Sequence, residues 1–183
     1  MSDTAVKLVK RHQRVAFMDT DTTGKTPKFE RMTGFTSLTN SKNPKEYSRQ
    51  YVDRESEDTD VVGYSPSVAY SFDRHTNTPV HERIAKVHDG ELTGSDALVD
   101  ILIVDIFAQA GGETEACVAR KRTYAIIPDA DGDGNDALIY TGSFKSKSDI
   151  EEGTAIVSDD GKTAAYTAPT TPPEPEEPAN LSK

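Results

Sequence analysis

The chain has 183 residues, of which 34% are hydrophobic and 28% charged, and its formal net charge is −10. This length is enough for one domain of ordinary size with a real core, or for one small domain plus arms. The acidic balance argues against a nucleic-acid-binding surface of the usual basic kind, and it is otherwise typical of a soluble surface.

Targeting and redox signals are weak. The N-terminus lacks the uninterrupted apolar run of a signal peptide. The most apolar stretch, Ala97 to Ala110, is interrupted by Asp100 and Asp105 and is too short to span a bilayer. A single cysteine, Cys117, allows neither an internal disulfide framework nor a Cys-rich zinc site. We therefore expect a protein made in a cytoplasm, soluble there, and without a membrane partner.

The first 33 residues predict an N-terminal arm that leads into the domain proper. Arg14 to Met18 has the composition of a short strand. Asp19 to Lys28 contains Gly24 and Pro27 and is turn-forming. Phe29 to Met32 is expected to lead into the next strand.

Gly34 to Arg74 contains two strand-like runs, Lys45 to Val52 and Ser67 to Asp73, with aromatic and β-branched residues at period two. We expect both to be sheet members whose aromatic faces turn to the core. The connection from Asp53 to Pro66 is too long for a tight turn, and loops of this length are usually functional or disordered. Its first half is acidic and its end is apolar, which predicts a loop that docks on another surface. The residues concerned are Asp53, Glu55, Glu57, Asp58, Asp60, Val61, Val62 and Tyr64.

A short helix is predicted from Pro79 to Asp89. Proline suits the first helical position, apolar residues recur at helical spacing, and Gly90 supplies the stop. His81 and His88 lie on this helix seven residues apart, a spacing that does not chelate one metal by itself. We expect both histidines to face solvent.

Two long strands follow. Ser95 to Gln109 is apolar on both parities and rich in β-branched residues, which favours a strand that is covered on both faces or lies in an interface, although its length also suits a helix. Glu115 to Ile127 is expected to be the next strand, ended by Pro128. Its basic triplet, Arg120-Lys121-Arg122, requires acidic neighbours. Cys117 within it is expected to be a small buried hydrophobe.

The C-terminal third predicts more strands and then a tail. A turn from Asp129 to Asp136 precedes a strand from Ala137 to Lys145. Asp159-Asp160-Gly161 contains Asp-Gly, which is a strong hairpin signal. The remaining predicted segments are a hairpin of Gly153–Ser158 with Lys162–Ala168 and a disordered Pro/Glu-rich tail, which divides the chain into residues 1–168 and 169–183.

One motif could bind a metal. Asp129, Asp131 and Asp133 match the start of an EF-hand-like calcium loop, but its twelfth position falls on Tyr140 and the neighbouring segments are strands. A plain turn is therefore the favoured interpretation, with calcium binding as the alternative. No nucleophile elbow, phosphate loop or dinucleotide fingerprint is present, so we expect no catalytic residues, no cofactor and no enzyme.

The segment GFTSLTNSKNPKEYSRQYVDR, followed by TDVVGYSPSVAYSFD, then by a short helix after PVHE and a long apolar strand, resembles the major tail tube proteins of tailed phages that infect Gram-positive bacteria. The resemblance implies a mainly β fold: a tail-tube-type β-sandwich or split barrel with one short flanking α-helix and a long inter-strand loop. It also implies hexameric rings stacked into a tail tube, in which that loop reaches the neighbouring ring and through which DNA passes at ejection.

The implied partners are further copies of the chain, the tape measure protein and other tail proteins, in a virion assembled after synthesis in the host cytoplasm. An acidic lumen would not hold DNA, because phosphate contacts need cations. Two alternatives stay open. A calcium-dependent β-sandwich binding module predicts a monomer, and a ring-forming terminator or joining protein predicts single rings that never stack.

Overall fold

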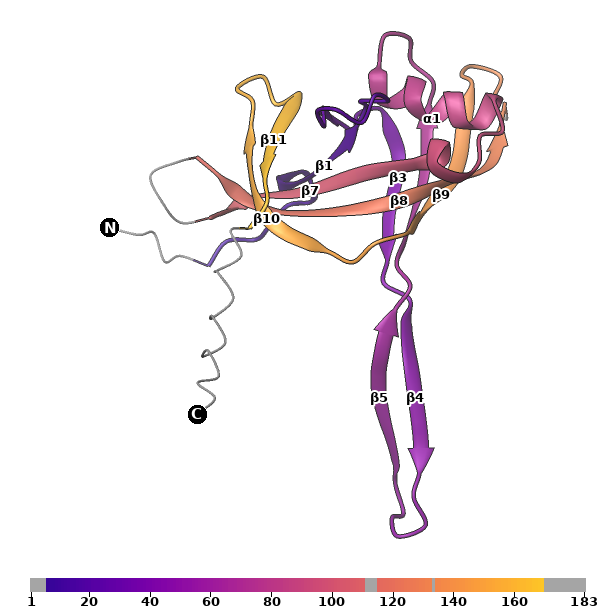
Figure 1. The fold of residues 1–183 in the computed structure, drawn as a ribbon, viewed down its shortest axis with the longest axis vertical. Helices are drawn as coiled ribbons and strands as arrows, with labels where there is room; N and C mark the ends of the chain where they lie inside the picture. The colour runs from indigo at the N-terminus through magenta and orange to yellow at the C-terminus, as the bar shows by residue number, and fades with distance from the viewer. Residues whose placement is uncertain (1–5, 111–114, 133, 170–183) are drawn as a thin grey trace, which may run out of the picture.

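The computed structural model describes residues 6–110, 115–132 and 134–169 (Figure 1). The chain forms a mainly β fold with one α-helix, as predicted. The strands are β1 Arg14–Asp19, β2 Phe29–Arg31, β3 Phe35–Ser41, β4 Pro44–Gln50, β5 Glu57–Tyr64, β6 Ser67–Asp73, β7 Leu98–Gln109, β8 Cys117–Asp131, β9 Ile139–Ser146, β10 Glu151–Val157 and β11 Thr163–Thr167. The helices are α1 Pro79–Asp89 and the short 3₁₀ turns Arg11–Gln13 and Gly94–Ala97.

Six strands close into a barrel in the order β10-β11-β2-β1-β7-β8, and pairing of β8 with β10 completes the circle. β8 makes this possible because it is long enough to have two neighbours on one edge. It pairs with β10 from Cys117 to Lys121 and with β9 from Tyr124 to Asp131, while β7 occupies its other edge. β9, β6 and β3 then extend the sheet away from the barrel. The result is a closed six-stranded barrel with three further strands, within the mainly β fold that was expected.

The barrel has its own apolar core. Strand β7 shows how one strand serves two cores, because Leu102 and Val104 point into the barrel while Val99 and Ile101 face the opposite side. The prediction of a strand covered on both faces is therefore confirmed for Leu98 to Asp105, whereas Ile106 and Phe107 are each 41% exposed. Cys117 lies in the barrel core as a small buried hydrophobe, and burial raises the pKa of its thiol. The core residues are Val15, Phe17, Phe29, Leu102, Val104, Cys117, Ala119 and Ala155.

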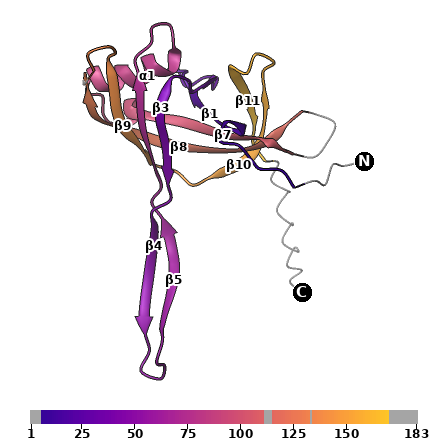
Figure 2. The same ribbon diagram turned by 180° about the vertical axis from the view of Figure 1, so that it is seen from behind.

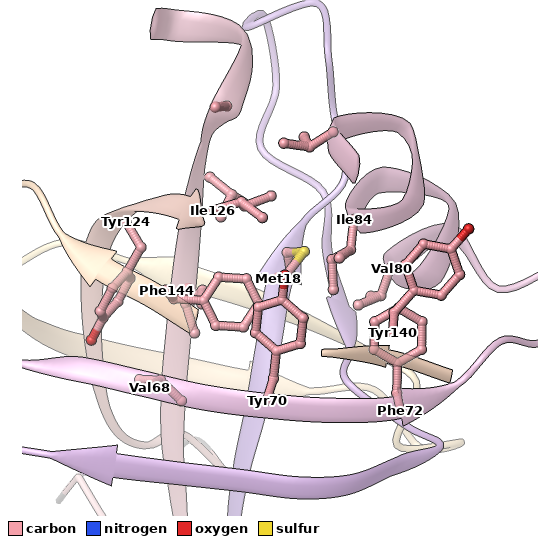
Figure 3. Close-up of a cluster of buried hydrophobic side chains, with 14 of the residues drawn as sticks. Met18, Val68, Tyr70, Phe72, Val80, Ile84, Tyr124, Ile126, Tyr140 and Phe144 are labelled. Carbon is pink, nitrogen blue, oxygen red and sulfur yellow. The ribbon is translucent and has the colours of Figure 1, made fainter. Parts of the chain in front are cut away.

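A second core lies between α1 and the outer face of the sheet (Figure 3). Val80 and Ile84 of the helix pack against aromatic side chains from β6 and β9. Phe72 is fully buried there, with its ring centroid 5.5 Å from that of Tyr140 in a stacked arrangement and 4.3 Å from that of His81. Burying a side chain of this size contributes about 1.5–3 kcal/mol. This layer fixes the position of β6 and of the strands that continue from it.

The helix prediction is confirmed, but the expectation for its histidines is wrong. His81 is only 1% exposed, because it shares the apolar face of α1 with Val80, Ile84 and Ala85. Its Nδ1 accepts a hydrogen bond from the His75 backbone N–H at 3.1 Å, and its Nε2 donates to the Thr33 carbonyl at 2.8 Å. These two partners fix the neutral imidazole. His88 is half-buried and bonds the Tyr70 hydroxyl at 2.7 Å.

Stability is expected to fall as the pH drops from 7 towards 5.5. Burial lowers the pKa of His81, and burial also lowers the pKa of His88. The unfolded chain therefore binds more protons than the folded chain below the ordinary histidine pKa of about 6.5, which favours unfolding. Urea denaturation at a series of pH values should show a loss of up to about 1.4 kcal/mol per pH unit for each histidine. A His81→Gln variant should show a shallower slope, and an unchanged slope would contradict this assignment.

Several of the remaining strand boundaries differ from the predictions. For example, β7 begins at Leu98 and not at Ser95, because Gly94–Ala97 form a 3₁₀ turn. Pro128 does not end β8, which continues to Asp131 past a register shift between Pro128 and Ala130. A proline is tolerated beside such an irregularity because the ladder is already interrupted there. The turn before β9 is consequently shorter than predicted. The C-terminal hairpin is confirmed as β10 paired with β11, and residues 170–183 of the predicted tail lie outside the described residues.

Two residues of the basic triplet in β8, Arg120 and Lys121, have the acidic neighbours that were predicted for it. Asp105, which is only 4% exposed, pairs with both Arg14 and Arg120. Lys121 pairs with Glu151 at 2.9 Å. These contacts join β1, β7, β8 and β10 and so support the closed part of the sheet.

Candidate assembly surface

Strands β4 and β5 form a two-stranded ribbon that projects away from the barrel, as both views of the molecule show (Figures 1 and 2). We call residues Pro44–Tyr64 the arm. The strands pair antiparallel from Pro44 opposite Tyr64 to Gln50 opposite Glu57. Seven residues of strand span roughly 23 Å. Within the described residues, β4 and β5 pair only with each other.

The arm corrects the predicted loop from Asp53 to Pro66. Most of that segment is the strand β5, and the turn that joins it to β4 occupies only residues 51–56. Of the residues assigned to the loop, Asp53 and Glu55 lie in this turn, and the others belong to β5: Glu57, Asp58, Asp60, Val61, Val62 and Tyr64. The segment is extended because β4 supplies its hydrogen-bonding partner, which the sequence alone did not reveal.

The arm exposes apolar side chains along its length. All seven residues of β4 are exposed, including Tyr47 at 48%. On β5, Val61, Val62 and Tyr64 are 53%, 65% and 62% exposed. The expectation that Tyr47 and Tyr51 face the core is wrong, because the ribbon has left the body and has no core beneath it. Apolar groups gathered on a projecting element mark a contact surface.

Charge is unevenly distributed on the arm. β4 carries Lys45, Glu46 and Arg49, whereas β5 carries three carboxylates and no basic residue, and the turn carries two carboxylates and Arg54. Arg49 lies opposite Asp58, and Arg54 of the turn bonds the same carboxylate at 2.7 Å. The tip and the β5 strand are therefore the acidic part of the arm.

The base of the arm is held to the body. The Ser65 backbone N–H donates to the Asn43 carbonyl at 3.0 Å, and the Asn43 side chain donates to Ser67 Oγ at 3.1 Å. The ribbon continues directly into the β3–β6 pair of the large sheet. A free two-stranded hairpin is marginally stable in water. The ribbon is anchored at its base, and among the described residues no other strand pairs with it along its length. This arrangement suits a ribbon that packs against another molecule.

A second unpartnered feature is the edge of β3. Among the strands described in the large sheet, β3 is the one with a neighbour on a single side, namely β6. Most of its residues are exposed. An open edge presents backbone N–H and C=O groups that can pair with another strand. This strand was not predicted, because its Thr, Ser and Asn residues do not form an apolar alternation.

Other candidate sites have no added support. Asp129 and Asp131 lie in β8, and Asp133 lies outside the described residues, so the calcium loop stays a prediction. In the described ranges, no group of three or more His, Cys, Asp or Glu residues could hold a metal ion. The same ranges contain no helix that is long and apolar enough to cross a membrane.

Sequence comparisons find neither a matching family model nor a matching curated protein. Solved structures do match. A chain from the tail of an empty gene transfer agent particle with C6 symmetry is 14% identical with a TM-score of 0.54, and the match covers 78% of this chain and 97% of that one. A chain from the native gene transfer agent virion is 12% identical with a TM-score of 0.52, covering 79% and 98%. An anti-feeding prophage baseplate chain is 11% identical with a TM-score of 0.47, covering 81% and 97%.

At these identities the likeness is one of fold, and it extends over almost the whole of the matched chains. The protein therefore has the fold of subunits that build gene transfer agent tail and virion structures.

Proposed function

We propose that this chain is the major tail tube protein of a tailed phage, a structural virion protein whose hexameric rings stack into the conduit for DNA ejection. The observation that carries the proposal is the arm, a projecting ribbon with exposed apolar residues and no partner among the described residues of its own chain. The fold shared with a subunit of a six-fold symmetric tail supports the same function.

Two contacts build the tube in this proposal. The open edge of β3 pairs with a strand of the adjacent subunit, which protects it and closes a heterologous contact into a ring. The arm then reaches from one ring to the next, with Val61, Val62 and Tyr64 buried in the contact. The tape measure protein and other tail proteins would be further partners. The overall acidity of the chain suits a lumen that releases DNA.

A concentration series of the purified full chain tests this function. Sedimentation velocity and negative-stain imaging should show six-copy rings and, at higher concentration, stacked tubes. Single rings that never stack at any concentration would instead identify a terminator or joining protein. Monomers at every concentration would overturn the proposal. Adding a chelator should leave the assemblies unchanged, whereas the calcium-dependent module predicts a loss of stability.

A further inference from the structure

A groove of about 490 Å³ lies on the body of the protein, beside the second core and the base of the arm. Its floor is apolar and is formed by side chains of five strands, including Leu38, Val68 and Ile101. Basic residues outnumber acidic ones around it by six to one, Glu152 being the acidic residue. The basic residues that line the groove are Arg11, Arg14, Lys42, Arg120, Lys121 and Arg122. In a chain with a net charge of −10, this cluster is unusual.

Part of this positive charge is not neutralised locally. Arg14 and Arg120 share Asp105, and Lys121 pairs with Glu151. Lys42 and Arg122 have no acidic partner within 4 Å among the described residues. The buried Nε of Arg122 also has no hydrogen-bond acceptor there. The groove therefore presents cations that can donate hydrogen bonds to carboxylates of another molecule.

The arm has the complementary chemistry. Its tip and its β5 strand combine carboxylates, such as Glu55 and Asp60, with exposed apolar side chains, such as Val62. The groove combines an apolar floor with a basic rim. On this match of charge and polarity we infer that the acidic arm of one copy binds in the basic groove of a neighbouring copy. The inference deepens the proposed function and rests on it.

The arm that fills a groove must come from another copy. Lys42 lines the groove and comes two residues before the arm begins, so the groove opens beside the base of the chain's own arm. The tip of that arm is held away from the base by the length of the paired ribbon, roughly 23 Å. Each subunit thus carries a donor and an acceptor at different places. Such a contact is heterologous and repeats from copy to copy.

Charge reversal on the full chain tests the inference. The arm variant is Glu55→Lys with Asp60→Lys, since neither carboxylate takes part in the arm's salt bridge between Arg54 and Asp58. The groove variant is Lys42→Glu with Arg122→Glu. Each should raise the concentration needed for stacking at least about tenfold, because like charges then face each other. The chain with all four reversals should return to within about threefold of the original value. A mixture of the arm variant and the groove variant should also stack. In alternating rings, each basic arm then faces an acidic groove and each acidic arm faces a basic groove.

A second groove variant, Lys42→Glu with Arg11→Glu, changes two exposed residues and guards against misfolding of the first. Circular dichroism should match the parent chain for every variant. If the reversals leave stacking unchanged while deletion of the arm abolishes it, the groove assignment is wrong and the proposed function stands. A different outcome would overturn the inference: the groove variant loses a salt-sensitive binding to a DNA fragment, and the chain with all four charge reversals does not stack. The groove would then be a site for phosphate groups.

Discussion

Replacing Pro44–Tyr64 with two glycines is expected to abolish ring stacking while the body stays folded. The backbones of Asn43 and Ser65 are already joined by a 3.0 Å hydrogen bond, so a short turn can close the gap. Both apolar cores consist entirely of residues outside the arm. The melting temperature should therefore change by less than about 5 °C, which for a chain of this size corresponds to one or two kcal/mol. Imaging should show rings or monomers, but no tubes.

A matched control separates the arm's side chains from its presence. Val61→Ser with Val62→Ser keeps the ribbon and its charges but removes apolar groups that are 53% and 65% exposed. Burying such a side chain in a contact contributes about 1.5–3 kcal/mol, so stacking should weaken without being lost. Tubes of normal length from the deleted chain would show that the arm does not join rings.

Phe72→Ala should lower the free energy of unfolding by about 3–5 kcal/mol, the usual loss for a buried phenylalanine. The side chain is 0% exposed and contacts the rings of Phe35, His81 and Tyr140. Removing the phenyl ring opens a cavity where α1 packs on β6, the strand that continues from the arm. Chemical denaturation of the unassembled chain measures the effect.

Tyr47→Ala is the control for this substitution, because Tyr47 is 48% exposed on the arm. Its free energy of unfolding should stay within about 0.5 kcal/mol of the parent value, as for most surface positions. A loss below about 1 kcal/mol for Phe72→Ala would mean that the second core contributes less than its burial indicates.

The elements that the sequence predicts well are those whose signals are local. Pro79 and Gly90 bound α1, and the apolar spacing between them is typical of a helix with one buried face. Alternate residues of β7 are apolar on both faces of the strand because each face packs into a different core. Asp160 and Gly161 mark the last hairpin, whose strands pair as expected.

The elements that sequence reasoning missed depend on distant partners. Neither β3 nor β5 has a consistently apolar face, since both are largely exposed, and each is a strand because another segment pairs with it. One signal was present in the predicted strand Lys45 to Val52, where Arg49 lies between Tyr47 and Tyr51 on one parity, an arrangement that a core-facing strand seldom carries. His81 lies on the buried face of α1, and its ring nitrogen is satisfied there because Thr33, 48 residues away, supplies a backbone acceptor.

The groove was also beyond sequence analysis. Arg11, Lys42 and Arg122 come from three well-separated segments and meet only when β1, β3 and β8 join one sheet. An overall charge of −10 conceals a local basic surface of this kind. The basic triplet in β8 indicated that its charges need acidic neighbours. Our inference assigns the carboxylates that face Arg122 to the arm of a neighbouring copy.

Cryo-electron microscopy of assemblies formed by the full chain tests the central claim most directly. The proposal predicts six subunits in each ring and, for every subunit, an arm that crosses to the next ring and lies against the body of a subunit there. Tubes in which the arms lie free or fold back on their own subunits would contradict it, as would a preparation that never forms rings.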